Sequence, residues 1–92
     1  MSTNQNNIGQ KMNIYRLQFA CRCPANDNQI IYTLEIQSDK MIYVEHIVVE
    51  VGRNESDYHE AIADRLHVTF GGQQLMTATH HGVNIETRRG FA

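Results

Sequence analysis

The fold is decided by residues 15–36, which read YRLQFACRCPANDNQIIYTLEI. Apolar and polar residues alternate in the first part, which predicts a half-buried strand with one face formed by Tyr15, Leu17, Phe19 and Cys21. Pro24 and the polar run at 26–28 predict a turn. The last part alternates again, with one face formed by Ile30, Tyr32, Leu34 and Ile36. We therefore predict a hairpin of two strands with its loop near Cys23.

Two further segments follow, and the first is ambiguous. Residues 41–51 are rich in β-branched side chains, which favours a strand. The same segment has apolar residues at the helical spacing i, i+3, i+4 and i+7, namely Val44, Ile47, Val48 and Val51. Residues 57–70 predict a clearer helix, capped by Ser56 or Asn54 and ended by Gly71-Gly72. One side of that helix would carry Tyr58, Ile62, Leu66 and Thr69.

The C-terminal segment, residues 74–89, predicts a second hairpin that turns near His81-Gly82. The expected order is strand, strand, helix or strand, helix, strand, strand. Both hairpins would pair antiparallel, with the helices on one face of the sheet. We therefore predict a single α+β domain over residues 12–92, preceded by a polar N-terminal tail at 1–11 that we expect to be disordered.

Size and charge narrow the classes of function. A chain of 92 residues makes one domain with a small core, so we expect it to gain stability by forming a homo-oligomer. The formal net charge of −2 argues against a general attraction to nucleic acid. We see neither an apolar run of membrane-spanning length nor the apolar stretch of a signal peptide. We therefore expect a cytoplasmic protein with free thiols and no membrane partner.

Two cysteines and five histidines raise the question of a zinc site. The spacing of Cys21 and Cys23 is not one of the usual spacings of structural zinc ligands. His80 and His81 are neighbours, and neighbouring residues of a strand point to opposite faces of the sheet. We therefore predict no metal site.

Cys23 stands where the first strand enters a loop, just before Pro24. A thiol in that place can reach a pocket, and it becomes a nucleophile when its thiolate form is stabilised. The alternative is that Cys23, like Cys21, is a small half-buried apolar residue.

The pair His59-Glu60 opens the second helix, where a carboxylate favours the helix dipole without needing any other role. Helical spacing places Glu60 away from the apolar stripe, on a solvated or interface side. The residues alone leave open whether this pair and Cys23 serve function or only structure.

Several short motifs together resemble one family. Residues 19–24, Phe-Ala-Cys-Arg-Cys-Pro, resemble the Phe-x-x-x-Cys-Pro stretch that carries the nucleophile of the 7-cyano-7-deazaguanine reductases (the QueF family) and of their short archaeosine-synthase relatives. In both groups an acidic residue follows, as at Glu45. A His-Glu pair then opens a helix, as at 59–60, and a last hairpin turns near a glycine, as at Gly82. The resemblance covers residues 19–89 and depends on the order and spacing of these motifs.

The resemblance implies the T-fold (tunnelling fold), a strand-strand-helix-helix-strand-strand unit that associates into rings with sites between subunits. Residues 41–51 would then form a helix. Cys23 matches the nucleophile that adds to a nitrile as a thioimide. Glu60 matches the carboxylate that binds the guanine-like edge of the base, with His59 beside it. An ionised carboxylate suits this role because it accepts two parallel N–H bonds. The implied partner is a small purine-like or deazaguanine ligand, either free or carried by a tRNA.

The sequence also departs from the family in two places. The family has an aspartate seven residues after the cysteine, where this chain has Ile30. Asp27, four residues after Cys23, could replace it only in a rearranged loop. The reductases carry a Glu-Ser-Lys-Ser-x-x-Lys stretch linked to their nicotinamide cofactor, whereas this chain has Glu-His-Ile-Val at 45–48. We therefore expect no cofactor and no reduction by NADPH.

Two hypotheses from different classes remain. In the first, the protein is a QueF-like enzyme in which Cys23 attacks the nitrile of a deazaguanine and ammonia or water completes the reaction. In the second, it is a non-catalytic T-fold module that binds a purine or pterin or serves in assembly. A T-fold enzyme acting on a pterin is a third route, but the metal-ligand pattern of those families is not met. Cys23 favours the enzyme, and Ile30 favours the binding module.

Overall fold

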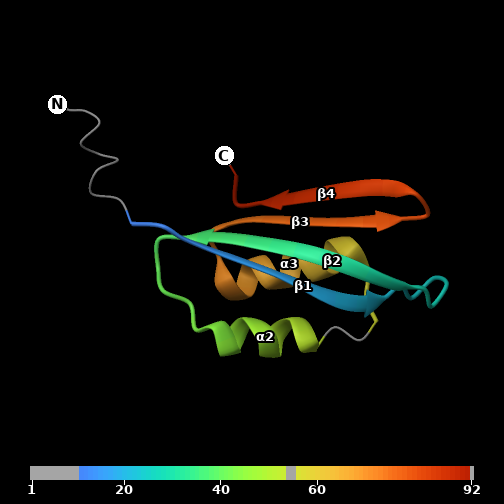
Figure 1. The fold of residues 1–92 in the computed structure, drawn as a ribbon, viewed down its shortest axis with the longest axis horizontal. Coiled ribbons are helices and arrows are strands. Elements are labelled where there is room, and N and C mark those ends of the chain that lie inside the picture. The colour runs from blue at the N-terminus through green and yellow to red at the C-terminus, as the bar shows by residue number, and fades with distance from the viewer. Residues whose placement is uncertain (1–10, 54–55, 92) are drawn as a thin grey trace.

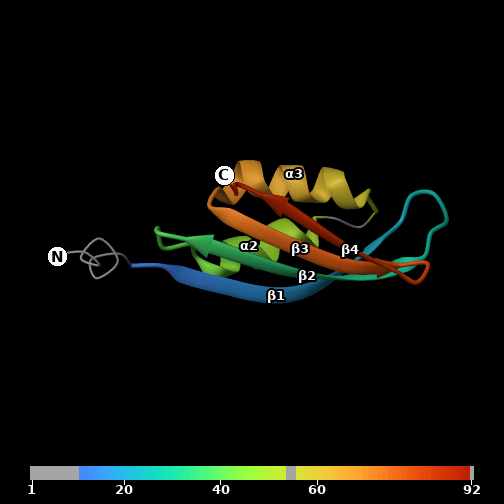
Figure 2. The same ribbon diagram turned by 90° about the horizontal axis from the view of Figure 1, so that it is seen from above.

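The computed structural model describes residues 11–53 and 56–91. Two strands, β1 (Asn13–Arg22) and β2 (Gln29–Ser38), precede two helices, α2 (Val44–Gly52) and α3 (His59–Phe70). Two more strands follow, β3 (Gln73–His80) and β4 (Val83–Arg89). The strands form one antiparallel sheet in the order β1-β2-β3-β4, and both helices cover the same face of it (Figures 1 and 2). The predicted α+β class and its ββααββ order are confirmed.

The register of the strands brings the apolar positions to the face that the helices cover. Leu17 pairs with Leu34 across the first hairpin, and Leu34 pairs with Met76 of β3. The second hairpin turns at His81 and Gly82, which both have positive φ, at 51° and 78°. Two central residues with positive φ fit the twist of a tight antiparallel hairpin. The turn predicted near His81-Gly82 is therefore confirmed.

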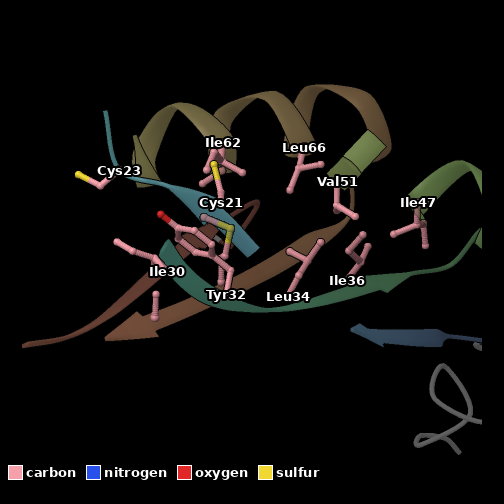
Figure 3. Packing of buried hydrophobic residues seen from close by; sticks show 13 residues of the cluster. Cys21, Cys23, Ile30, Tyr32, Leu34, Ile36, Ile47, Val51, Ile62 and Leu66 are labelled. Atoms are coloured by element: carbon pink, nitrogen blue, oxygen red, sulfur yellow. The ribbon is translucent and has the colours of Figure 1, made fainter. Parts of the chain in front are cut away.

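The core lies between this face of the sheet and the two helices (Figure 3). Its fully buried side chains with the largest volumes are Tyr32, Leu34, Ile36, Ile62, Leu66 and Met76. The strand pattern read from the sequence is confirmed here, since Ile30, Tyr32, Leu34 and Ile36 are all buried.

The ambiguous segment forms the helix α2, but its apolar stripe is only half buried. Ile47 and Val51 pack into the core, whereas Val44 and Val48 are 60% and 56% exposed. The reason is that α2 faces the sheet only along the i, i+4 line of Ile47 and Val51, leaving Val44 and Val48 at the rim of a shallow hollow beside β1. The hydroxyl of Tyr15 in β1 accepts a hydrogen bond of 2.9 Å from the backbone N–H of Ile42, which fixes the start of α2.

Helix α3 differs from its prediction at the N-terminus. It begins at His59 rather than Asp57, and its N-cap is Tyr58, which makes no side-chain capping bond. Ser56 is not the cap, because it forms a β-bridge with Arg22, while the other suggested cap, Asn54, lies outside the described residues. Ile62 and Leu66 are buried as predicted, but Tyr58 and Thr69 are exposed. The helix ends at Phe70 and Gly71 caps it with φ 66°, as expected.

The predicted N-terminal tail falls almost entirely on residues 1–10, which lie outside the described residues. The described chain begins at Lys11, and β1 begins at Asn13, close to the predicted domain boundary. Within the described parts of the chain, none of the helices is long and apolar enough to cross a membrane.

Candidate functional site

The loop between β1 and β2 fixes the backbone of Cys23. The N–H of Cys23 donates to the carbonyl of Asn28 at 2.9 Å, and the carbonyl of Cys23 accepts from the N–H of Asp27 at 2.7 Å. Asp27 occupies the left-handed region with φ 61°, a conformation that Asn and Asp tolerate better than other non-glycine residues. The side chain of Asn26 closes the loop by accepting from the N–H of Asn28. Cys23 is thus fixed at the first position of a hydrogen-bonded turn.

A second contact brings the segment that precedes α3 beside this turn. Arg22 forms a parallel bridge with Ser56, and its carbonyl accepts a hydrogen bond of 3.1 Å from the N–H of Asp57. Arg22 directly precedes Cys23, and Asp57 lies two residues before His59. The bridge therefore joins the two segments that carry the predicted site residues, although they are far apart in the sequence.

Between these segments lies a pocket with a volume of about 190 Å³. All three predicted site residues, Cys23, His59 and Glu60, line it. The strands contribute the rest of the wall together with the lead-in to α3: Ile30, Tyr32, Asp57, Tyr58, Ala78, His80 and Ile85. The N-terminus of α3 lies at the pocket, where its dipole favours an anion such as a thiolate.

The two cysteines differ in position rather than in burial. Cys21 is 2% exposed and Cys23 is 5% exposed, so both are buried although Cys23 lies at the start of a loop. The lead-in to α3 lies beside both, since the carbonyl of Asp57 is 3.9 Å from Sγ of Cys21, and Asp57 and Tyr58 line the pocket with Cys23. Cys21 lies within the core, where its thiol is near the carbonyls of Arg22 and Asp57, and burial raises the pKa of that thiol. Cys23 belongs to the same core cluster but also lines the pocket, and its sulfur points away from the other labelled side chains (Figure 3).

Tyr32 lines the pocket beside the thiols. Its ring stacks on Phe19 at 5.2 Å and meets the edge of the His59 ring at 5.2 Å. Burial, together with the neighbouring Cys21 and Cys23 thiols, raises the pKa of Tyr32 to about 12. The phenol therefore remains neutral near pH 7.

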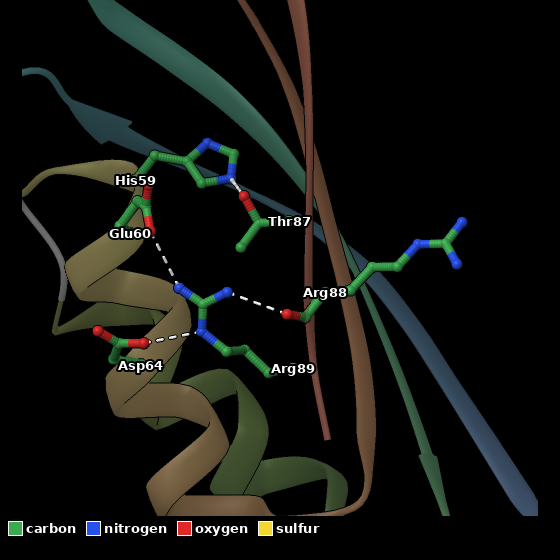
Figure 4. Close-up of polar contacts among 6 residues, drawn as sticks. All are labelled: His59, Glu60, Asp64, Thr87, Arg88 and Arg89. Carbon is green, nitrogen blue, oxygen red and sulfur yellow. Dashed lines mark hydrogen bonds and ion pairs between the residues drawn. The ribbon is translucent and has the colours of Figure 1, made fainter. Parts of the chain in front are cut away.

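His59 is held in place by β4. Its Nε2 atom lies 2.8 Å from the hydroxyl oxygen of Thr87, and the ring is partly buried (Figure 4). Burial lowers the pKa of His59, and the charge of Glu60 and a hydrogen bond with the backbone of Met76 oppose this effect. The ring is therefore favoured in its neutral form, in a fixed orientation at the pocket wall.

Glu60 lies at the mouth of the pocket, with its side chain 82% exposed. Its Oε1 atom accepts a hydrogen bond of 3.1 Å from Nη2 of Arg89 in β4 (Figure 4). The same guanidinium donates to Asp64, one turn further along α3, at 2.8 Å. These contacts, with Asp64 first, raise the pKa of Arg89. The exposure predicted for Glu60 is confirmed, and the carboxylate still has lone pairs for a further ligand.

Ile30 and Asp27, the two residues at which the aspartate of the family pattern was sought, lie in different surroundings. Ile30 is buried in the pocket wall, so an apolar side chain stands there. Asp27 does not line the pocket. It is exposed on the loop, with its carboxylate 3.9 Å from Arg22.

Two polar residues of the pocket, Asp57 and His80, are not among the site residues predicted from the sequence. Asp57 precedes the His-Glu pair and is predicted there only to start a helix, and His80 is weighed only as a metal ligand. The sequence does contain a sign that His80 belongs to the site, because His80 ends a strand that returns toward the first loop.

A metal site and a second hollow on the sheet are the other places where a function could be sought. Within the described residues, no group of three His, Cys, Asp or Glu side chains is arranged to hold a metal ion. A larger and more open hollow of about 740 Å³ lies on the sheet beside the pocket, sharing Ile30, Ala78 and Ile85 with it. Its other residues are mostly Gln, Thr and Asn, with neither a thiol nor an imidazole among them. The smaller pocket is therefore the candidate site.

This arrangement of one four-stranded antiparallel sheet, with two helices inserted between its hairpins on one face, is the T-fold. A solved structure of similar fold is described as the crystal structure of the archaeosine synthase QueF-Like in the apo form. The two structures agree with a TM-score of 0.68, over 88% of this chain and 95% of the other, at 10% sequence identity. No protein-family model matches the chain, and no curated protein matches it. The expected resemblance is thus confirmed for the fold.

Proposed function

We propose that the protein is a cytoplasmic, QueF-like T-fold enzyme that acts on the nitrile of a 7-cyano-7-deazaguanine base through Cys23, without NADPH. One observation carries this proposal: Cys23, His59 and Glu60 line one pocket of about 190 Å³ although a loop, a strand and a helix separate them in the chain. A thiol, an imidazole and a carboxylate at one concave site supply a nucleophile, a base and a binding group, the parts that nucleophilic catalysis commonly uses.

The chemistry follows from the three side chains. The sulfur of Cys23 adds to the nitrile carbon and forms a thioimide. Ammonia or water then attacks the thioimide carbon, and the C–S bond breaks to release the Cys23 thiol. Glu60 accepts two N–H bonds from the amino-pyrimidinone edge of the base, a charge-assisted contact that orients it. His59, held by Thr87, supports the other side of the ring. Holding the nitrile near the sulfur replaces a bimolecular encounter with a positioned one.

The residues on α2 support a reaction without NADPH. The segment 45–48 forms the first turn of α2 and carries Glu, His, Ile and Val, with no lysine to meet the phosphates of a nicotinamide cofactor. We expect no loss of NADPH absorbance that depends on 7-cyano-7-deazaguanine. A rate above that of a no-protein control would contradict this part of the proposal.

We further propose that the working form is a homo-oligomeric ring. β1 and β4 are the two edges of the sheet, and unpaired edges favour pairing with another copy. The exposed Glu60 carboxylate at the pocket mouth suits a site that a neighbouring subunit completes. Light scattering at micromolar concentration should give a mass of several subunits, and a stable monomer would contradict both the ring and the shared site.

The enzyme proposal is tested by incubating the purified protein with 7-cyano-7-deazaguanine and weighing it intact. Addition of a thiol to a nitrile loses no atoms, so the protein should gain the whole mass of the base. The gain should be absent with 7-deazaguanine, which has no nitrile. A protein that binds both bases without any gain in mass would contradict the enzyme.

That outcome would favour the second function, a base-binding module. Two observations support this alternative. Ile30 occupies the place of the family's aspartate, and Cys23 is only 5% exposed. In this case the Cys23→Ala variant should bind either base as tightly as the unmodified protein, whereas Glu60→Gln should weaken binding of both.

A further inference from the structure

His80 is the one polar side chain in the pocket wall that the proposed function leaves unused and that has an unsatisfied atom. It closes β3, where it pairs with Val83 across the second hairpin, and it lines the pocket with Cys23. Its Nε2 atom is buried and has no hydrogen-bond partner in the described parts of the chain. Buried polar atoms in folded proteins are nearly always paired, so an unpaired one calls for an explanation, and a catalytic role is one of those known.

A second contact ties the turn that carries His80 to the loop that carries Cys23. The ring of His81 lies 4.7 Å from the ring of His80, and its Nε2 atom is 2.9 Å from Nδ2 of Asn26. Asn26 belongs to the closed turn that begins at Cys23. The turn that carries His80 is therefore held against the loop that carries Cys23, and both residues line the pocket.

Addition of a thiol to a nitrile needs an acid at this place. As the sulfur bonds to the nitrile carbon, one carbon–nitrogen π bond breaks and its electron pair moves to nitrogen, which must gain a proton. Ile30 has no proton to give. Asp27 lies outside the pocket, on the exposed part of the loop.

The other pocket residues are poorly suited to donate this proton. The carboxylate of Asp57 is already engaged, because its Oδ1 atom accepts from the N–H of Tyr58 at 2.8 Å. Glu60 is paired with Arg89, and Nε2 of His59 is engaged by Thr87. Tyr32 is a weaker acid than a free phenol because its pKa is raised to about 12. His80 is left as the group with both a suitable chemistry and an unused nitrogen.

We propose that His80 carries the proton of the Cys23 thiol to the nitrile nitrogen of the bound base. The imidazole first accepts the proton of the S–H group, which leaves a thiolate and an imidazolium. The thiolate then forms the S–C bond, and the imidazolium returns the same proton to the nitrogen. The product is a neutral thioimide, no further reactant is consumed, and His80 ends neutral. This inference rests on the proposed function and names the residue that replaces the family's aspartate.

The test compares the rate of adduct formation with 7-cyano-7-deazaguanine, followed by intact mass, in four proteins. These are the unmodified protein, His80→Gln, His80→Asn and the control His81→Gln, whose amide can still meet Asn26. Binding of 7-deazaguanine to each is measured by calorimetry. We expect about a hundredfold slower addition in both His80 variants, in the range of general acid–base catalysis, with unchanged binding and a control within about twofold.

The outcomes separate the two proposals. Addition at the unmodified rate in either His80 variant contradicts the role of His80 and leaves the enzyme standing. Loss of 7-deazaguanine binding together with loss of addition in both His80 variants also contradicts it, because His80 would then be structural. An unmodified protein that forms no adduct contradicts the proposed function itself, and the role of His80 fails with it.

Discussion

Arg89 of β4 and Glu60 of α3 are joined by an ion pair of 3.1 Å at the mouth of the pocket (Figure 4). Arg89 also holds Asp64 at 2.8 Å, so its guanidinium bridges two successive turns of the helix. The carboxylate proposed to bind the base is thus positioned by a residue from the far end of the chain.

We expect Arg89→Gln to weaken binding of 7-cyano-7-deazaguanine about three- to tenfold, measured by calorimetry in a Cys23→Ala background. The effect is modest because Glu60 is largely exposed and water screens the pair. The matched control is Arg88→Gln, which removes the neighbouring arginine and its pair with Glu86 on the same strand. Equal or tighter binding in Arg89→Gln, or an equal loss in the control, would show that Arg89 does not position Glu60.

The contact between His59 and Thr87 should contribute to stability. Thr87→Val removes the hydroxyl and leaves a partly buried ring nitrogen without its partner, which should lower the free energy of unfolding by about 1–2 kcal/mol in urea denaturation. The control Thr79→Val makes the same substitution on the neighbouring strand, where the hydroxyl meets Asn84 on the surface. We expect less than about 0.5 kcal/mol there. Equal losses at the two positions would count against a special role for the His59 contact.

The lowered pKa of His59 predicts a dependence of stability on pH. Burial disfavours the charged ring in the folded state, so the unfolded chain takes up the proton first as the pH falls. The stability that the neutral ring contributes is therefore complete above the unfolded pKa of about 6.5 and is lost as the pH falls toward the lower folded value. Between about pH 7.5 and 5.5, the free energy of unfolding should fall more steeply in the unmodified protein than in His59→Gln. Parallel curves would contradict this assignment.

The strands and their faces could be predicted from the sequence because alternation at period two is read directly from neighbouring residues. Tyr32 and Leu34 were placed correctly for this reason. The helix over 41–51 could not be predicted from composition, since its β-branched residues favour a strand locally and only packing of Ile47 and Val51 on the sheet decides otherwise. The start of α3 was misjudged because Ser56 pairs with Arg22 of a distant strand, a tertiary contact that no local signal reveals.

Only those residues of the candidate site that belong to short sequence motifs could be predicted. Cys23, His59 and Glu60 were named from the resemblance, and they line one pocket. His80, Asp57 and Arg89 were not assigned to the site, because their place depends on the register of the hairpins and on the bridge at Arg22. The near-equal burial of Cys21 and Cys23 could not be predicted from the sequence either, since it depends on tertiary packing.

The central claim is that Cys23, and not Cys21, is the nucleophile. The direct measurement is peptide mapping of the protein after reaction with 7-cyano-7-deazaguanine, with Cys23→Ala, Cys21→Ala and Glu60→Gln treated in parallel. We predict that the peptide containing Cys23 gains the mass of the base. This adduct should be retained in Cys21→Ala, absent in Cys23→Ala and formed in smaller amount in Glu60→Gln. An adduct that maps to Cys21, or one that persists in Cys23→Ala, would contradict the account.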